Sequence, residues 1–389
     1  MVTNKKIIAV IFGGKSAEHD ISIITAHIPI IQSLTAGGQF DIWPIYIAKN
    51  GSWYSDQTMN DLEFFKKNDF ENYLSERKKI RLLFDNGLKI IWPGFRQKTI
   101  TIDIVFPAMH GTFGEDGSLM GLLRMTNTPF VGCDIFASAV AMDKALTKQV
   151  LAAENIPIVP FVWFTKYEWE KNKNDLTQKI KKLKWPLFIK PVHLGSSIAI
   201  TKIKQESELE NAVEVAFHYD DKVLAEESVE NLIEVTLPII GNDELQLGGI
   251  ERPLNKTGFF NFNDKYLSNN KKSGGANNQY SEIPANINDN LKQQVENLGK
   301  QTYRLLGCSG IARVDFLIDN SSQKVFVNEV NTLPGSLYYH NWRKMGVSGV
   351  DLVTKLVALA EERFQKQKNI TYTFHSDILN QIGGKKITE

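Results

Sequence analysis

The chain has 389 residues, and 45 Lys and Arg against 44 Asp and Glu give a net charge of +1. This balance, without a strongly basic run, gives no electrostatic support for binding nucleic acid or a membrane surface. The two cysteines, Cys133 and Cys308, lack metal-ligand spacing, as in a reducing cytosol. The sequence shows no run long enough to span a membrane and no signal-peptide pattern. We therefore expect a cytoplasmic globular protein of two or three domains.

The first third of the chain alternates apolar runs with more polar, helix-like stretches. Such apolar runs are typical of buried parallel strands that end in loops. They lie at residues 6–12, 42–47 and 102–107, and a hairpin is expected near 89–92 in an insert over 50–100. The alternation predicts an N-terminal α/β domain over residues 1–138.

Two glycine-rich loops follow strand ends in this region, where open α/β sheets bind their ligands. Gly13-Gly14 lacks the remaining glycines of a Walker or Rossmann motif, so it is expected only to present backbone N–H groups, with Ser16 capping the next helix. Glu18 fits either that helix's dipole or a substrate ammonium. His110 lies with Glu115 among three glycines in the second loop, which favours a functional over a structural histidine.

The rest of the chain divides into two further units. A helix expected over 137–154 leads into strand–helix–strand patterns that predict a central domain over 139–228. A final domain is expected over 229–367, closed by a helix over 350–367, and residues 368–389 form a tail. The predicted fold class is therefore α/β (α+β) in three domains.

The central region contains groups suited to a nucleotide. Lys190 ends an apolar strand and is followed by Gly195-Ser196-Ser197, which offers N–H and hydroxyl donors to phosphate. Lys144 is a second candidate cation at the domain junction. Each lysine alone is more typical of a solvated surface. The acids at the next strand ends suit a ribose or an adenine edge: Glu226, Glu227 and Glu234.

A long polar segment over 262–280 is rich in Asn, Ser, Lys and Gly. So long a polar loop inside a compact domain is typically either a functional lid or a disordered segment. Lys265 and Tyr266 lie at its base, where a lid would close over phosphates and exclude water.

The most informative stretch is a predicted hairpin, residues 313–331, whose two apolar strands are joined by a polar turn. Because side chains alternate along strands, Arg313 and Asp315 share one face, as do Glu329 and Asn331. If the register aligns these faces, the oxygens suit a hard cation such as Mg²⁺, and the arginine can stabilise developing negative charge. The alternative is an ordinary hairpin with a polar solvent face.

Seven motifs in order and spacing resemble those of the D-alanine–D-alanine ligases of the ATP-grasp superfamily, over roughly residues 5–365. They are Gly13-Gly14-Lys15-Ser16-Ala17-Glu18-His19, His110-Gly111 to Gly117, Met142-Asp143-Lys144, Lys190-Pro191 to Ser197, Lys265-Tyr266, Arg313-Val314-Asp315 and Glu329 to Gly335. The resemblance implies a three-domain ATP-grasp fold with ATP between the central and C-terminal domains. It also implies a homodimer acting on small amino-acid substrates.

The same resemblance implies a role for each matching residue. Two Mg²⁺ or Mn²⁺ ions would be held by Asp315, Glu329 and Asn331. ATP would be bound by Lys144, Lys190, Lys265, Ser196, Ser197, Glu226, Glu227, Glu234 and Asn331. The first amino acid would be held by Glu18 and His110, and the acyl phosphate and oxyanion by Arg313 and the Gly335 N–H. Ser196 and Tyr266 would orient the lid and the attacking amine, and tyrosine at that position accompanies peptide products.

Some positions depart from the family pattern. His340 stands where a serine helps to hold the second substrate's carboxylate, Leu232-Ile233 precede Glu234 where Gly-Arg or Gly-Pro is usual, and Ala199 replaces a glycine. The leading interpretation is an ATP-dependent ligase that joins two D-alanines through D-alanyl phosphate in peptidoglycan precursor synthesis. The alternatives are a divergent ligase with a different second substrate and an inactive nucleotide-binding regulatory protein.

Overall fold

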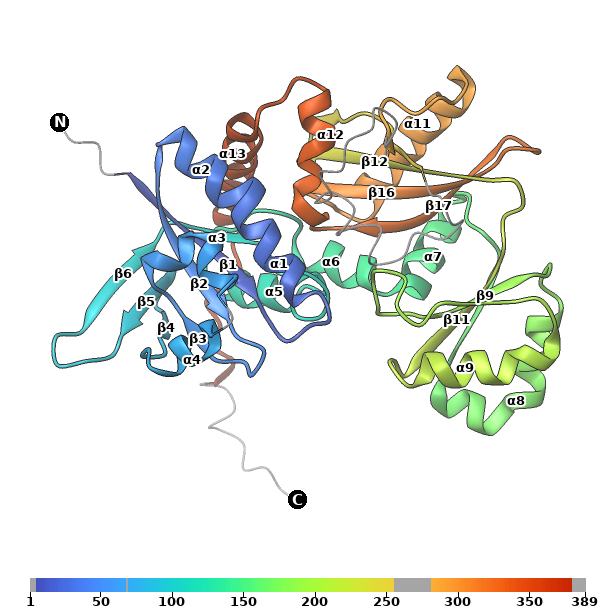
Figure 1. The fold of residues 1–389 in the computed structure, drawn as a ribbon, viewed down its shortest axis with the longest axis horizontal. Coiled ribbons are helices and arrows are strands. Elements are labelled where there is room, and N and C mark those ends of the chain that lie inside the picture. Colours follow the sequence, from blue (N-terminus) through green and yellow to red (C-terminus); the bar gives the residue numbers. More distant parts are fainter. Residues whose placement is uncertain (1–4, 68, 255–280, 380–389) are drawn as a thin grey trace.

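The computed structural model describes residues 5–67, 69–254 and 281–379 of the protein. Within them lie three four-stranded sheets, one in the N-terminal third, one in the central region and one near the C-terminus. Figure 1 shows the N-terminal sheet at one end of the molecule and the other two stacked at the opposite end. No helix of the described ranges is long and apolar enough to cross a membrane.

The N-terminal sheet has the order β3-β2-β1-β7. Strands β1 (Lys6–Gly13), β2 (Phe40–Ile47) and β7 (Ile104–Pro107) are parallel, and β3 (Trp53–Tyr54) is antiparallel. Residues of β1 alternate between two cores: Ile8, Val10 and Phe12 pack in one, and Ala9 and Ile11 in the other. Both faces of the sheet are thus covered, which explains why β1 reads as a continuous apolar run.

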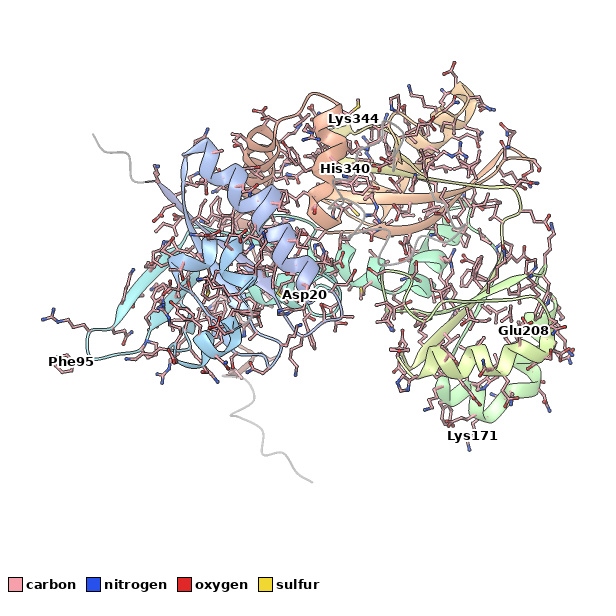
Figure 2. The ribbon with its side chains drawn as sticks, viewed as in Figure 1. Asp20, Phe95, Lys171, Glu208, His340 and Lys344 are labelled. Atoms are coloured by element: carbon pink, nitrogen blue, oxygen red, sulfur yellow. The ribbon has the colours of Figure 1, made fainter. Side chains whose placement is uncertain are left out.

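Helices cover the two faces of this sheet. One face meets a continuous helix made of α1 (His19–Thr25), a π-helical segment η1 (Ala26–Ile31) that contains Pro29, and α2 (Gln32–Gly37). The other meets α5 (Ser118–Met125) and the strands of the insert, whereas the helices of the insert pack on the first face. The insert contains η2 (Gln57–Asn60), α3 (Leu62–Phe65), α4 (Phe70–Ser75), β4 (Arg81–Phe84), β5 (Leu88–Trp92) and β6 (Lys98–Ile102). The predicted hairpin is therefore confirmed, with β4 as a third strand, and Figure 2 shows Phe95 at the β5–β6 turn.

The single helix predicted over 137–154 is wrong, because the chain forms α6 (Ile135–Met142) and α7 (Lys144–Ala153). Asp143 between them has an extended backbone, with φ −87° and ψ 100°. Its side chain accepts the Leu146 N–H at 2.8 Å and so caps α7. An N-cap inside an apolar, helix-like sequence therefore starts a second helix.

The central sheet is antiparallel and has the order β10-β9-β11-β8. Its strands are β8 (Phe161–Thr165), β9 (Leu187–Pro191), β10 (Thr201–Ile203) and β11 (Lys222–Glu227). Helices α8 (Lys166–Lys181) and α9 (Leu209–Phe217) cover one face in Figure 1, and η3 (Glu206–Glu208) precedes α9. The predicted strands at 186–189 and 223–227 are confirmed.

The C-terminal sheet is also antiparallel, with the order β13-β12-β16-β17. Its strands are β12 (Leu232–Gly241), β13 (Leu245–Leu247), β16 (Gly310–Asp319) and β17 (Lys324–Asn331), beside a small pair β14 (Arg252–Pro253) and β15 (Ser281–Glu282). The helical elements are α11 (Asp289–Leu305), η5 (Gly335–Tyr338), α12 (Tyr339–Lys344) and α13 (Gly349–Lys368). The closing helix is confirmed, and α13 packs back on the N-terminal core.

Trp342 joins the two ends of the chain. Its side chain is fully buried in the core that contains β1, α2 and α13. Removing so large a side chain leaves a cavity that neighbouring elements fill poorly.

We expect Trp342→Ala to destabilise the protein by about 3–5 kcal/mol, whereas Trp342→Phe, which keeps an aromatic ring in the site, costs less. Urea unfolding followed by far-UV circular dichroism measures both midpoints. Equal midpoints for the alanine variant and the parent would contradict this packing role.

Candidate active site

Two adjoining pockets lie among the three sheets. The larger is a cleft of about 1390 Å³, and the smaller has about 80 Å³. Both are lined by Lys144, Ser196, Arg313, Glu329 and Gly335. The cleft adds Lys190, Ser197, Glu226, Glu227, Glu234, Asp315 and His340, and the small pocket adds Glu18, His110 and Asn331. All predicted site residues within the described ranges therefore line these pockets, whereas Lys265 and Tyr266 lie outside those ranges.

The hairpin β16–β17 has the register that brings its polar residues together. Arg313 pairs with Asn331 and Asp315 with Glu329 across the two strands, so the predicted alignment is confirmed. The Arg313 guanidinium donates from Nε and Nη2 to the two Asp315 oxygens, each at 2.6 Å. Asn331 Nδ2 donates to Asp315 Oδ2 at 3.1 Å. Four side chains of different chemistry thus form one patch on the cleft wall.

The patch has the donor set of a hard-cation site. Two carboxylates, Asp315 and Glu329, meet the Asn331 amide, whose nitrogen faces Asp315 and leaves its oxygen for another partner. Oxygen ligands of this kind suit Mg²⁺ or Mn²⁺, so the residues fit such ions. Burial opposes the charge on Arg313, but Asp315 beside it holds the pKa of the guanidinium above its usual value. Arg313 therefore remains a cation at the edge of the patch.

Glu18 lies where two glycine loops meet. Its side chain is buried and accepts a hydrogen bond from Ser196 Oγ. A Cβ on Gly111 would lie 3.2 Å from Glu18 Oε2, and one on Gly195 would lie 3.3 Å away. Gly111 also has φ +69°, a conformation that side chains with a Cβ rarely adopt. The glycines thus let the backbone approach the carboxylate closely.

The Gly13-Gly14 loop after β1 differs from its prediction. The Gly13 N–H donates to Ser22 Oγ at 2.7 Å and the Gly14 N–H to the Ile47 carbonyl at 2.8 Å, so neither is presented to a ligand. Ser16 does not cap α1, which begins at His19 without a side-chain cap. Instead Ser16 Oγ donates to the His110 carbonyl at 2.7 Å and ties the two loops together.

Buried His110 and partly buried Glu115 lie close together in the small pocket. His110 Nδ1 lies 4.0 Å from Glu115 Oε2, which accepts the Gly111 N–H at 2.8 Å. Burial lowers the pKa of His110 to about 4, with Glu18 opposing the shift. Burial, with repulsion from Glu18, raises the pKa of Glu115 to about 8. At neutral pH His110 is therefore uncharged and Glu115 protonated.

Thr25, which sequence reasoning missed, connects this pocket to the turn after β17. Its hydroxyl is 2.8 Å from His110 Nε2 and accepts the Ser336 N–H at 3.0 Å. In that turn Ser336, Leu337 and Tyr338 have φ of 51°, 50° and 54°. Three successive left-handed residues without glycine are strained, and such strain is retained where the surroundings fix it, often at functional sites.

The lysines of the cleft have partners on other elements. Lys144 Nζ donates to the Leu194 carbonyl at 2.6 Å and lies 3.9 Å from Glu329 Oε2. Lys190 is paired with Glu226, and so is Lys148, a buried lysine that sequence reasoning missed. The sequence feature that could have indicated Lys148 is its position on the same helix as Lys144, four residues later. The expected contact of Glu226 with adenine or ribose remains a prediction, and its carboxylate already binds two lysines.

His340 lies at the mouth of the cleft on α12, where Figure 2 labels it with Lys344. Its Nε2 is 2.8 Å from an oxygen of Glu251, a buried acid that no sequence motif indicated. The His340 ring is 4.7 Å from that of Tyr338, over which the Arg313 guanidinium lies at 5.0 Å. Half of the His340 side chain is exposed, so it can meet a ligand while Glu251 orients it.

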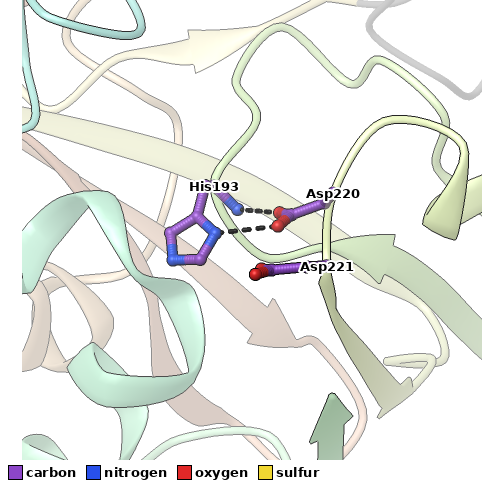
Figure 3. Close-up of side chains that lie close together, drawn as sticks. All are labelled: His193, Asp220 and Asp221. Atoms are coloured by element: carbon purple, nitrogen blue, oxygen red, sulfur yellow. Dashed lines mark hydrogen bonds and ion pairs between the residues drawn. The ribbon is translucent and has the colours of Figure 1, made fainter. Parts of the chain in front are cut away.

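A second cluster joins α7 to the central sheet. His193 Nδ1 is 2.9 Å from Asp220 (Figure 3), and its Nε2 is 3.4 Å from Asp143. Asp143 also accepts a hydrogen bond from Lys222 at 2.6 Å. His193, Asp220 and Asp221 lie close enough together to hold a metal ion. Hydrogen bonds that the imidazole donates to Asp143 and Asp220 raise the pKa of His193 to about 9. A protonated imidazole does not ligate metal, so we interpret the cluster as an ion-pair network.

This network predicts a pH dependence of stability. Because the pKa of His193 is raised from 6.5 to about 9 by folding, its stabilisation is complete below pH 6.5 and is lost as the pH rises through about 9. The shift corresponds to at most about 3 kcal/mol, and solvent screening of a side chain that is 41% exposed reduces it to about 1 kcal/mol.

The measurement is the urea midpoint between about pH 6 and pH 9.5. His193→Gln is expected to remove this part of the pH dependence, and His375→Gln, in the exposed C-terminal segment, to leave it unchanged. Identical pH profiles for His193→Gln and the parent would contradict the assignment.

Comparisons with known proteins place the chain in one family. Residues 7–133 match the family model D-ala D-ala ligase N-terminus, and residues 150–358 match D-ala D-ala ligase C-terminus. The chain is 35% identical over 374 residues to the D-alanine–D-alanine ligase of Thermosipho africanus, covering 96% of this chain and 98% of that protein. It is 36% identical to that of Natranaerobius thermophilus, covering 94% and 97%.

Two solved structures extend this similarity to the fold. The D-alanine–D-alanine ligase from Coxiella burnetii has a TM-score of 0.77 at 31% identity, over 94% of this chain and 96% of that one. The VanG D-Ala:D-Ser ligase from Enterococcus faecalis has 0.75 at 31%, over 92% and 100%. The resemblance noted in the sequence is confirmed: the chain belongs to the D-alanine–D-alanine ligase family, which uses ATP, and has its ATP-grasp fold.

Proposed function

We propose that the protein joins two D-alanines at the expense of ATP. The first D-alanine's carboxylate attacks the γ-phosphorus, and ADP leaves. The amine of the second then attacks the acyl carbon of D-alanyl phosphate, loses a proton and expels phosphate, which gives D-alanyl-D-alanine for peptidoglycan. The main support is the meeting of two pockets at Arg313 and Glu329, a small one that contains Glu18 and a larger one lined by Lys144 and Lys190.

The long cleft suits ATP in this proposal. Lys144 and Lys190 neutralise phosphate charge, and the Ser196-Ser197 turn offers donors to the same oxygens. Glu226, Glu227 and Glu234 also line the cleft, where they suit the ribose and adenine. Lys265, outside the described residues, is the third proposed phosphate-binding lysine.

Asp315, Glu329 and Asn331 would hold two Mg²⁺ or Mn²⁺ ions, which when bound would offset the charge of the phosphate oxygens. The chain's own contribution to this step is to fix the carboxylates in register across the hairpin. Phosphoryl transfer depends chiefly on such positioning and charge neutralisation.

The small pocket suits the first D-alanine. Glu18 is placed to bind its ammonium, and uncharged His110 lies beside it without repelling that cation. Arg313 and the Gly335 N–H line both pockets and are proposed to stabilise the acyl phosphate and the tetrahedral oxyanion. Ser196, bonded to Glu18, and Tyr266, outside the described ranges, are proposed to orient the attacking amine.

Further proposals rest on the family. We infer that residues 1–138, 139–228 and 229–367 act as first-substrate, central and C-terminal domains, followed by the tail at 368–389. We also infer a homodimer in the cytoplasm, where ATP is available. An inactive regulatory protein is disfavoured, because nucleotide binding alone does not need Arg313 beside an intact metal patch.

A divergent ligase remains the second candidate function, and one observation favours it. His340, held by Glu251, faces the cleft where a family serine would stand, and a relative at 31% identity is a D-Ala:D-Ser ligase. A coupled ADP-release assay with D-alanine alone, then paired with D-serine, D-lactate and L-amino acids, tests both candidates. If neither D-alanine alone nor any of the pairs causes ADP release, the ligase proposal is overturned.

Glu329→Gln keeps the side chain's size but removes one negative charge from the metal patch. Turnover at saturating Mg²⁺ is expected to fall at least about a hundredfold, as for the loss of one electrostatic contact to the transition state. Glu362→Gln on the exposed face of α13 is the matched control. Turnover within about threefold of the parent would contradict the assignment of Glu329 to the metal patch.

His340→Ser tests the second subsite. If His340 contacts the second substrate, its Michaelis constant is expected to change at least about fivefold, with those for ATP and the first amino acid nearly unchanged. Glu251→Gln, which weakens the bond that orients His340, is expected to shift the same constant in the same direction. Constants for the second substrate that match the parent's from about pH 6 to 9 would reject the contact.

A further inference from the structure

Three charged groups meet in the wall of the cleft with only one of them negative. Glu226 on β11 binds Lys148 through Oε1 and Lys190 through Oε2. Lys148 comes from α7 and Lys190 from β9, the strand beside β11. The carboxylate thus has two cationic partners, one more than its charge requires.

The two lysines differ in what they can reach. The side chains of Lys148 and Glu226 are each 1% exposed, whereas that of Lys190 is 13% exposed and opens toward the cleft. Lys190 is also the last polar residue of β9 before the loop that contains Ser196. It can therefore turn toward a ligand phosphate, while Lys148 is confined to Glu226.

A buried carboxylate that loses its partner is costly, because an uncompensated charge is left in a medium of low dielectric. If Lys190 moved to a phosphate and Glu226 had no other cation, that cost would oppose nucleotide binding. We propose that Lys148 is a positioning residue, the fixed counter-ion of Glu226 that frees Lys190 to bind nucleotide phosphate. The inference rests on the proposed nucleotide site and explains how Lys190 becomes free to bind phosphate there.

The ionisation of the pair agrees with this role. Burial raises the pKa of Glu226, but Lys148 and Lys190 outweigh it and hold that pKa below its usual value. Burial, aided by Lys190, lowers the pKa of Lys148, and Glu226 opposes this shift. Beside the two lysines Glu226 is thus ionised, and its charge requires a cation.

The test is calorimetric binding of ADP with Mg²⁺, which does not require turnover. Lys148→Met removes the fixed cation and leaves Lys190 as the only cation paired with Glu226 among the described residues, so ADP is expected to bind at least about tenfold more weakly. The double variant Lys148→Met/Glu226→Gln removes the carboxylate that would retain Lys190. It is expected to bind ADP at least about fivefold more tightly than Lys148→Met.

Two controls separate this effect from general damage. Lys173→Met breaks an exposed ion pair with Glu210 on the same domain and is expected to leave ADP affinity unchanged. The Michaelis constant for the first D-alanine, whose proposed contacts lie in the small pocket, is expected to stay within about twofold in Lys148→Met. If Lys148→Met does not fold, Lys148→Gln, which keeps a hydrogen-bond donor to Glu226, has the same expected results.

The outcomes are distinct. Parent-like ADP affinity in Lys148→Met, or a double variant that binds ADP no better than Lys148→Met, would overturn the counter-ion role and leave the ligase proposal intact. A parent protein that binds no ADP would overturn the nucleotide site itself, and this inference with it. Weakened binding in the single variant with recovery in the double variant supports the inference.

Discussion

The site depends on the pairing of buried and partly buried charges, most of them on elements that are distant in sequence. Glu226 is neutralised by Lys148 and Lys190, Asp315 by Arg313, and Glu329 has Lys144 within 3.9 Å. The Lys148–Glu226 pair joins α7 to the central sheet, and the Lys144–Glu329 pair joins α7 to the C-terminal hairpin. Since an unpaired buried charge costs several kcal/mol, the elements of the cleft are held in the arrangement that satisfies all the pairs. The same charges are the ones that a phosphate-containing ligand would meet.

The sequence predicted those features of the site that follow from alternation along a strand. The faces shared by Arg313 and Asp315, and by Glu329 and Asn331, require only a period of two. Their alignment across the hairpin also depends on a register shift between Asp315 and Phe316, which the sequence did not indicate. The glycines around His110 likewise indicated close backbone approach, and Gly111 does approach Glu18. Buried parallel strands were evident because both of their faces are apolar. Such sequence patterns depend on neighbouring residues alone, so they predict local structure well.

What the sequence did not predict depends on tertiary contacts. Nothing near Glu251 indicates that it meets His340, and the partner of Lys148 lies on a strand of the central sheet. The N–H groups of Gly13 and Gly14 looked available because their acceptors, in α1 and β2, are unknown until the sheet is assembled. The helix break at Asp143 was missed for a related reason. Its cap competes with a helix-forming context, and the His193 network beyond it stabilises the break.

The strained turn after β17 shows how the three regions are coupled at the site. Each of its left-handed residues 336–338 has a contact outside the turn. Leu337 packs in the N-terminal core, the Ser336 N–H donates to Thr25 of α1, and the Tyr338 hydroxyl is hydrogen-bonded to Thr236 of β12. Gly335, whose N–H is proposed to meet the oxyanion, precedes these residues directly. A turn that costs free energy locally is retained only when its surroundings determine it, so the contacts from both ends of the chain fix this donor. Pre-set donors need no reorganisation during reaction, which is the condition under which they stabilise developing charge most effectively.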